Sequence, residues 1–277
     1  MEFSRVGLTD MPRTLVHYTN APAFMSILEG HALWASSIGY MNDSQEYHYL
    51  YVQARHFLEI GYGALRHYGD AHPEDLETFI NGVGWPYANS PSVYVIALST
   101  DDDDLNLWRA YTAPGEGYCI SFDSQKIREL AEKSGWRLAQ VEYGASCIPV
   151  LEDLWVRAFT KVEEGESSQE VLTWVNSRLA EIAPFYKHES FASEREWRLV
   201  KVQANFDQED LRFRPGVSFI VPFVVFDFGA PDQHSIVQVR CGPGPNQKLA
   251  FDSMDWMVDK IGWNPSRGVS NAPFRPW

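Results

Sequence analysis

Two carboxylates stand two residues apart, directly before an apolar run that predicts a strand. Because side chains alternate along a strand, Glu194 and Glu196 would share one of its faces. Two like charges at that spacing repel each other unless they share a proton, a cation or a ligand. Such a pair suits stabilisation of a positively charged sugar ring and activation of a hydroxyl group. The alternative is a solvated face on which Lys187, Arg195 and Arg198 neutralise the two glutamates.

A histidine is the second candidate for chemistry. His17 lies in a short apolar run at 15–19 that predicts a strand, and Asn20 with Pro22 predicts the start of a helix directly after it. A histidine at the end of a strand can donate a hydrogen bond to a sugar hydroxyl or act in acid–base chemistry. A purely structural role is the alternative.

The segment before the second predicted helix combines an aromatic ring with an amide and two carboxylates. Asn42 or Asp43 would cap that helix, and Glu46, three residues after Asp43, would complete an arrangement like a capping box. Capping accounts for the carboxylates. It does not account for Tyr40 or for the preceding Ser36.

Four consecutive carboxylates, Asp101 to Asp104, could hold a hard cation. They could equally begin the helix that runs through Trp108 and Tyr111, where the helix dipole favours anions. Their spacing matches no calcium loop, which favours the helix start. Nowhere does a cluster of His, Cys and Asp have the spacing of metal ligands, so we expect no metal.

The charge balance bears on the partners of the protein. The chain of 277 residues has 23 basic and 37 acidic side chains, a formal net charge of −14, and no basic run. An acidic surface repels phosphate backbones, so general nucleic-acid binding is disfavoured. Aromatic residues make up 14% of the chain, including 10 Trp. They offer stacking surfaces for a planar ligand, although large rings also fill cores.

Cysteine usage and hydropathy predict a cytoplasmic protein. Cys119, Cys147 and Cys241 are widely spaced and odd in number, which argues against a disulfide framework or a cysteine zinc site. The first residues lack the apolar core of a signal peptide. The longest apolar stretch, at 219–226, is interrupted by Pro222 and is too short to cross a bilayer.

Apolar periodicity predicts the order of the elements. Predicted strands cover 15–19, 33–36, 93–98, 118–122, 137–143, 197–202, part of 217–225, 236–241 and a short extended piece at 269–274. Predicted helices run from Asn20 to Gly30, from about Ser44, over 73–80, from the acidic run through Tyr111, from a cap at Ser124, over most of 150–186 with a break at 165–168, and over 247–261. Because strands and helices mix without regular βαβ alternation, we predict an α+β fold. The chain shows no linker or repeat, which predicts a single domain over 1–277 with a helical insertion near 150–186.

Taken in order, these pieces resemble a widespread bacterial family that is catalogued only as a domain of unknown function. The shared pattern comprises His17-Tyr18-Thr19, Leu33-Trp34-Ala35-Ser36, Asn42-Asp43-x-x-Glu46, Leu98-Ser99, Leu107-Trp108-x-x-Tyr111, Gly117-Tyr118-Cys119-Ile120-Ser121-Phe122, Lys187, Glu194-x-Glu196-x-Arg198, Gly242-Pro243 and Ser270-Asn271-Ala272-Pro273-Phe274-Arg275. The pattern spans nearly the whole chain, which supports one domain.

The chain also resembles ADP-ribosyltransferases of the His–Tyr–Glu type. In that family a strand-borne histidine meets the NAD ribose, a tyrosine stacks on nicotinamide, and a glutamate of an E-x-E strand orients the ribose at the reacting carbon. His17, Tyr40 and Glu196 are similar to these three positions, in that order. The tyrosine position could instead be filled by another aromatic residue: Tyr18, Tyr47 or Trp34.

This second resemblance implies an ADP-ribosyltransferase-like mixed sheet with flanking helices, and NAD as the substrate without a metal. It implies catalytic roles for Glu196, Glu194 and His17. The residues that it implies in binding NAD are His17, Tyr18, Ser36, Tyr40, Asn42, Trp108, Tyr111, Lys187 and Arg198.

We therefore expect an enzyme that cleaves the nicotinamide–ribose bond of NAD and transfers ADP-ribose to a macromolecule or to water, in a defence or toxin role. Glu196→Gln should then lower turnover and leave folding almost intact. One alternative is a metal-dependent hydrolase or nuclease that uses the carboxylates of Asp43, Glu46 and Glu196, which chelation would inactivate. The other is a non-catalytic module that binds a nucleotide without turnover.

Overall fold

The structure is a computed structural model that describes residues 11–41, 44–65, 73–84, 92–112, 117–203, 209–216, 218–233 and 235–273. Helices and a mixed sheet follow one another irregularly along these residues, which confirms the predicted α+β class. No helix within these ranges is long and apolar enough to cross a membrane.

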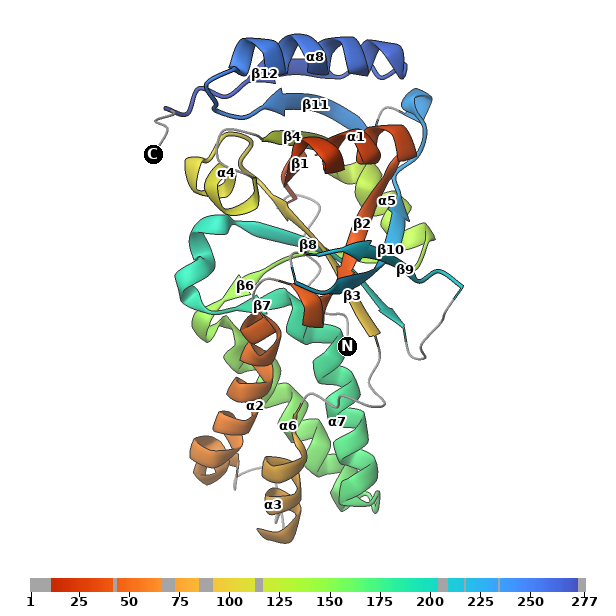
Figure 1. The fold of residues 1–277 in the computed structure, drawn as a ribbon. Coiled ribbons are helices and arrows are strands. Elements are labelled where there is room, and N and C mark those ends of the chain that lie inside the picture. The colour runs from red at the N-terminus through yellow and green to blue at the C-terminus, as the bar shows by residue number, and fades with distance from the viewer. Residues whose placement is uncertain are drawn as a thin grey trace.

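A ten-stranded sheet forms the centre of the fold (Figure 1). Its strands are β1 (Thr14–Thr19), β2 (Ala32–Ser37), β3 (Ser92–Ser99), β4 (Tyr118–Asp123), β5 (Arg137–Gln140), β8 (Glu196–Gln203), β9 (Arg212–Pro215), β10 (Ile220–Asp227), β11 (Ile236–Cys241) and β12 (Ser266–Val269). The main path runs β12-β11-β4-β1-β3-β2-β10-β9, and β8 lies between β3 and β5. The parallel pairing of β11 with β12 makes this otherwise antiparallel sheet, as far as the described strands show, a mixed one. The short β6 (Glu142–Tyr143) and β7 (Tyr186–Lys187) form a separate parallel pair.

Strand β3 is shared between two parts of the sheet. On one side it pairs along its whole length with β8. On the other side its residue Ser99 pairs with Val16 of β1, and Val95 pairs with Ser36 of β2. Strands β1 and β2 therefore meet β3 at different points, with Ala97 between the two pairings.

The two faces of the sheet carry separate hydrophobic cores, because side chains alternate along β3. Val93 and Val95 belong to a core that packs against helices at one end of the molecule (Figure 1). These helices are α2 (Ser44–Leu65), α3 (Pro73–Gly82), α6 (Ile148–Glu163) and α7 (Ser168–Ile182). Tyr94 and Ile96 belong to the core on the opposite face. The helices of that core are α1 (Ala21–Gly30), α5 (Ser124–Lys133) and α8 (Gln247–Lys260). Helix α4 (Leu105–Tyr111) packs with β1 in a third, smaller cluster.

Local signals in the sequence set the ends of several helices. The Oδ1 atom of Asn20 accepts a hydrogen bond from the amide of Ala23 at 3.0 Å, as predicted for the cap of α1. That helix ends where His31 adopts a left-handed φ of 52°. Ser167 and Glu170 form a capping box at the start of α7. Helices α6 and α7 occupy the segment in which a helical insertion is predicted.

Three boundaries differ from the predictions for local reasons. Asp123, and not Ser124, caps α5, because its carboxylate accepts from the amide of Lys126 at 3.0 Å. The strand predicted over 137–143 divides into β5 and β6 at Val141, whose amide donates to the carbonyl of Glu196 at 2.9 Å. The last strand is β12, which lies before most of the predicted 269–274 because it pairs with β11.

Candidate active site

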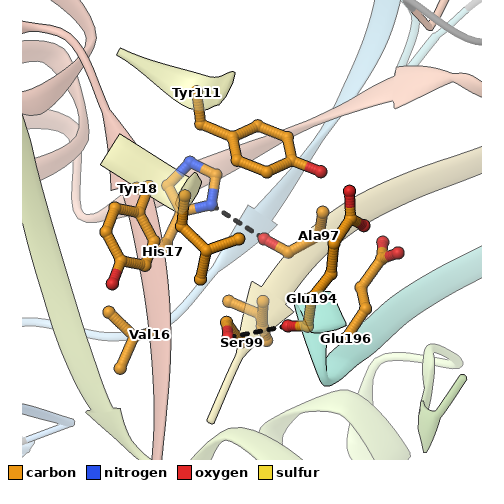
Figure 2. Close-up of a pocket in the computed structure, with 10 residues that line it drawn as sticks. Val16, His17, Tyr18, Ala97, Ser99, Tyr111, Glu194 and Glu196 are labelled. Atoms are coloured by element: carbon orange, nitrogen blue, oxygen red, sulfur yellow. Dashed lines mark hydrogen bonds between the residues drawn. The ribbon is translucent and has the colours of Figure 1, made fainter. Parts of the chain in front are cut away.

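A pocket lies beside the point where β1 and β2 part (Figure 2). Its walls come from β1, the end of β3, α4 and the start of β8. The lining residues are Val16, His17, Tyr18, Ala97, Leu98, Ser99, Leu107, Tyr111, Glu194 and Glu196. Its empty volume, including the part open to solvent, is about 340 Å³.

His17 lies in the opening of the sheet. Its Nδ1 atom is 3.0 Å from the carbonyl oxygen of Ala97. Because a carbonyl only accepts hydrogen bonds, Nδ1 carries the proton and Nε2 remains an acceptor. Burial lowers the pKa of His17, and the hydrogen bond to Ala97 opposes this shift only in part. The imidazole is therefore neutral near pH 7 and can accept a hydrogen bond or a proton from a ligand.

Glu196 is held by two buried cations. Its carboxylate accepts from Nε of Arg198 at 2.6 Å, from Nη2 of Arg198 at 3.0 Å and from Nζ of Lys187 at 2.9 Å. The exposed fractions of the three side chains are 4% for Glu196, 2% for Arg198 and 1% for Lys187. The predicted neutralisation by these two cations is present, but it takes place in the interior and not on a solvated face. Arg195 lies apart from it, 3.7 Å from a carboxylate oxygen of Asp101.

These contacts decide the charge of Glu196. Burial by itself would raise the pKa of Glu196, but the charges and hydrogen bonds of Arg198 and Lys187 outweigh burial and hold the pKa below its ordinary value. Glu196 is therefore ionised at neutral pH. A carboxylate has about four acceptor positions, and three donors already approach this one, so it can still orient a ligand hydroxyl.

Glu194 shares the same lysine but lies nearer to solvent. The distance from Nζ of Lys187 to Oε2 of Glu194 is 2.7 Å, and the Glu194 side chain is 19% exposed, against 4% for Glu196. Lys187 is thus the shared cation that two neighbouring carboxylates require. Figure 2 shows the two carboxylate groups next to each other on the pocket.

The pair comes together by a turn and not by strand alternation, so the predicted shared strand face was wrong. Glu194 is the last residue of the 3₁₀ helix η4 (Glu189–Glu194), and β8 begins at Glu196. Arg195, between them, has a left-handed φ of 45°. The hydroxyl of Ser99 donates to the carbonyl of Glu194 at 2.9 Å and ties this turn to β3.

Helix α4 brings the predicted aromatic residues to the site in two ways. Tyr111 lines the pocket and is 40% exposed. Trp108 is buried, donates from Nε1 to Asp103 at 2.9 Å and packs edge-on against Tyr18. The hydroxyl of Tyr18 donates to the carbonyl of Asp101 at 2.8 Å, and burial raises the pKa of Tyr18. Tyr111 therefore offers its ring to a ligand, whereas Trp108 and Tyr18 hold α4 in place.

The other residues predicted to bind NAD lie away from this pocket or outside the described residues. Ser36 is on β2 and accepts from Nη2 of Arg214 at 2.9 Å. Tyr40 is 45% exposed and packs edge-on against Phe219, with 5.9 Å between the ring centroids. Asn42 lies outside the described residues.

The acidic run at 101–104 has structural partners. Asp104 caps α4, as predicted, by accepting from the amide of Asn106 at 2.7 Å. Asp102 accepts from Nη2 of Arg240 at 2.7 Å. The run therefore starts a helix and ties it to β11.

The carboxylates of the metal-dependent alternative lie mostly beyond the described part of the chain. Asp43 is outside it, and the side chain of Glu46 is not described. Among the residues that are described, no group of three or more His, Cys, Asp or Glu is arranged to hold a metal ion.

Several residues that build the site were not predicted. Ala97 supplies the carbonyl that accepts the hydrogen bond of His17. The hydroxyl of Tyr143 accepts a hydrogen bond from the amide of Glu196 at 3.0 Å. The centroid of the Phe191 ring lies 4.7 Å from Nζ of Lys187. An alanine carries no functional side chain, so only the pairing of β3 reveals its role. Tyr143 and Phe191 stand in no motif that points to chemistry.

A known protein family matches the middle of the chain. The model of a family described as a protein of unknown function (DUF2971) matches residues 107–199, a stretch that runs from α4 into β8. It contains six of the predicted site residues: Trp108, Tyr111, Lys187, Glu194, Glu196 and Arg198. Comparisons with curated proteins and with solved structures found no match. The resemblance to ADP-ribosyltransferases stays a prediction, whereas over residues 107–199 the chain matches the family of unknown function that its motifs resemble.

Proposed function

We propose that this protein cleaves the nicotinamide–ribose bond of NAD and transfers the ADP-ribosyl group to a macromolecule or to water. One observation carries the proposal: His17, Tyr111, Glu194 and Glu196, from three distant parts of the chain, line the same pocket. They combine a hydrogen-bonding group for the ribose, an aromatic face and carboxylates next to a reacting sugar.

The proposed reaction is a substitution at the ribose carbon that bears nicotinamide. The carbon–nitrogen bond breaks, and both of its electrons leave with nicotinamide, which departs as a neutral molecule. Positive charge develops on the ribose ring, as in other glycosidic cleavages. An oxygen or nitrogen of the acceptor then bonds to the same carbon and gives up its proton.

The two glutamates would have different tasks. Glu196 is rigidly held and its charge is compensated by Arg198 and Lys187, so it suits orientation of a ribose hydroxyl. Glu194 is more exposed, so it suits stabilisation of the ribose cation and removal of the proton from the acceptor. Tyr111 would provide the aromatic face for nicotinamide in place of Tyr40, because it lines the pocket.

The direct test is incubation of the purified protein with NAD, followed by measurement of released nicotinamide and of mass added to components of a cell lysate. Wild-type protein should release nicotinamide, and Glu194→Gln should release much less. Glu129→Gln, on the exposed side of α5, is a matched control because it removes the same charge away from the pocket. Absence of nicotinamide release by wild-type protein, with and without lysate, contradicts the proposal.

A nucleotide-binding module without turnover is the second candidate. It is favoured by the compensation of Glu196, because a carboxylate that two cations neutralise stabilises a ribose cation less than a lone carboxylate does. Tight binding of NAD without release of nicotinamide would support this candidate over the first.

The cellular setting is part of the proposal. Cys119, Cys147 and Cys241 are free and buried, which suits the reducing cytoplasm. A defence or toxin role follows from the proposed transfer of ADP-ribose to a cellular acceptor, and the lysate experiment identifies that acceptor.

A further inference from the structure

The face of the sheet that carries the pocket continues beyond it onto β2, β10 and β9. Residues paired across antiparallel strands point to the same face. Ser36 pairs with Val95, and Val95 points to the same face as the pocket residues Ala97 and Ser99, two and four positions further along β3. The side chain of Ser36 is therefore on the pocket face of the sheet.

Trp34 is on this face too, next to the opening. It lies two residues before Ser36, and its indole stacks on Phe223 with 4.8 Å between the ring centroids and 27° between the ring planes. The side chain is 39% exposed. Phe223 stacks on one face of the indole, and the part of the indole that remains exposed can contact another planar ring.

Two arginines complete this surface. Arg212 pairs with Phe223, and Arg214 pairs with Val221, so both project on the same face of the edge strand β9. Nη2 of Arg214 donates to the hydroxyl of Ser36 at 2.9 Å. Within the described part of the chain, neither guanidinium forms an ion pair with a carboxylate. In a protein with a formal charge of −14, two such neighbouring arginines mark a local site for an anion.

We infer that Trp34, Arg214 and Arg212 form a subsite for the adenosine diphosphate part of the dinucleotide. The indole would stack on the base, and the guanidinium groups would bind the two phosphates. This inference rests on the proposed function, which puts the nicotinamide ribose in the pocket of His17 and Glu194. None of the residues that line this pocket comes from β2, β9 or β10, so the subsite lies outside it.

The spacing along the sheet suits one ligand that reaches both places. Ser36 is one strand away from Val95, about 5 Å, and Ala97 is two residues further along β3, about 7 Å. A dinucleotide with its nicotinamide ribose beside Ala97 would therefore place its phosphates over Ser36 and Arg214.

The test measures binding of ADP, which lacks the reacting ribose, by calorimetry. Arg214→Met and Trp34→Leu should each weaken ADP binding by about tenfold, and the more exposed Arg212→Met by about threefold. Matched controls are Arg128→Met on α5 and Trp256→Leu on α8, which is 72% exposed. These two variants should bind ADP as wild-type protein does. Melting temperatures confirm that each variant is folded.

A second measurement compares NAD with nicotinamide mononucleotide, which has no adenylate group. Trp34→Leu should lower kcat/KM for NAD much more than for the mononucleotide, which has no base to stack on the indole. Arg214→Met should lower kcat/KM for both, because the mononucleotide keeps one of the two phosphates. The inference is overturned if ADP does not bind to wild-type protein, or if it binds equally to Arg214→Met and Arg128→Met. If ADP binding follows the expected pattern but NAD is not cleaved, the subsite stands and the proposed reaction fails.

Discussion

Two groups of carboxylates lie on neighbouring parts of the same face of the sheet, and the fold uses them differently. In the acidic run, Asp104 accepts from a backbone amide and Asp102 from an arginine on another strand. In the glutamate pair, Glu194 and Glu196 share the buried Lys187 and line a pocket. The acidic run contains more carboxylates than the glutamate pair, yet only the glutamate pair lines the pocket in which a ligand could bind.

This difference teaches that the number of carboxylates is a poor guide to chemistry. Asp103 illustrates it, because Trp108, Asn271 and Ser270 all donate hydrogen bonds to its carboxylate. These contacts tie α4 to the segment after β12. Glu194 keeps part of its surface in a pocket, so a ligand can reach it.

The largest expected effect on stability comes from breaking the buried ion cluster around Glu196. Arg198→Met removes two donors from Glu196 and the 2.7 Å hydrogen bond to the carbonyl of Pro184. We expect a loss of about 3 to 5 kcal/mol in the free energy of unfolding, measured by urea denaturation. Arg128→Met, which removes a partly exposed pair with Glu132 on α5, should lose about 1 kcal/mol or less. Equal losses in the two variants would contradict the buried ion cluster.

Glu194→Gln tests whether the carboxylate that lines the pocket takes part in catalysis. If Glu194 stabilises the ribose cation, nicotinamide release should fall roughly a hundredfold, which corresponds to about 2.7 kcal/mol of transition-state stabilisation. The melting temperature should change little, because the side chain is partly exposed. Unimpaired turnover in this variant would remove Glu194 from the mechanism. Glu196→Gln is a poorer probe than the sequence implied, because it also disturbs a buried ion cluster.

A substitution in the acidic run is the control for Glu194→Gln, because the carboxylates of the run do not line the pocket. Asp103→Ala leaves the indole nitrogen of the buried Trp108 without its 2.9 Å partner and frees the backbone of Asn271. We expect a loss of about 1 to 3 kcal/mol in unfolding free energy. Turnover should fall far less than in Glu194→Gln. A hundredfold loss of activity in Asp103→Ala would show that the run and the pair are not separate in function.

A smaller effect is expected in the way the free energy of unfolding depends on pH. The pKa of Glu196 is lower in the folded protein than in the unfolded chain, so the unfolded chain takes up a proton first as the pH falls. The stability that Glu196 contributes is therefore full above its unfolded pKa and is lost as the pH falls through its folded pKa. Unfolding free energies measured from pH 6 to pH 3 should decline more steeply for wild-type protein than for Glu196→Gln. Parallel curves would contradict the assigned shift.

Local sequence signals predicted most of the elements. The apolar run of β3 and the cap at Asn20 depend on neighbouring residues alone, and both were predicted correctly. Strand β9 was missed, because Arg212 to Pro215 has little strand propensity and pairs only through β10. The turn at Arg195 was also missed, because a left-handed φ is uncommon for an arginine.

The candidate site was predicted only in part, because residue types can be read from the sequence but tertiary pairings cannot. The residue types of Glu194, Glu196 and His17 pointed to chemistry, and all three line one pocket. The burial of Arg198 and the opening of the sheet beside Ala97 depend on tertiary pairing, which no local pattern encodes. Two tyrosines line the pocket, Tyr18 and Tyr111, and Tyr111 comes from a helix that the three-residue pattern did not include.

The shared strand β3 also shapes how the chain is made. Its partner β8 leaves the ribosome about 100 residues later, which at typical rates of synthesis is roughly 5 to 20 s. During that interval the apolar side chains of Val93, Ile96 and Leu98 lack the neighbours that β8 provides. Pairings this far apart in sequence also slow folding, since a long loop must close before they form. The β8 edge of β3 therefore stays unpaired in the nascent chain during that interval.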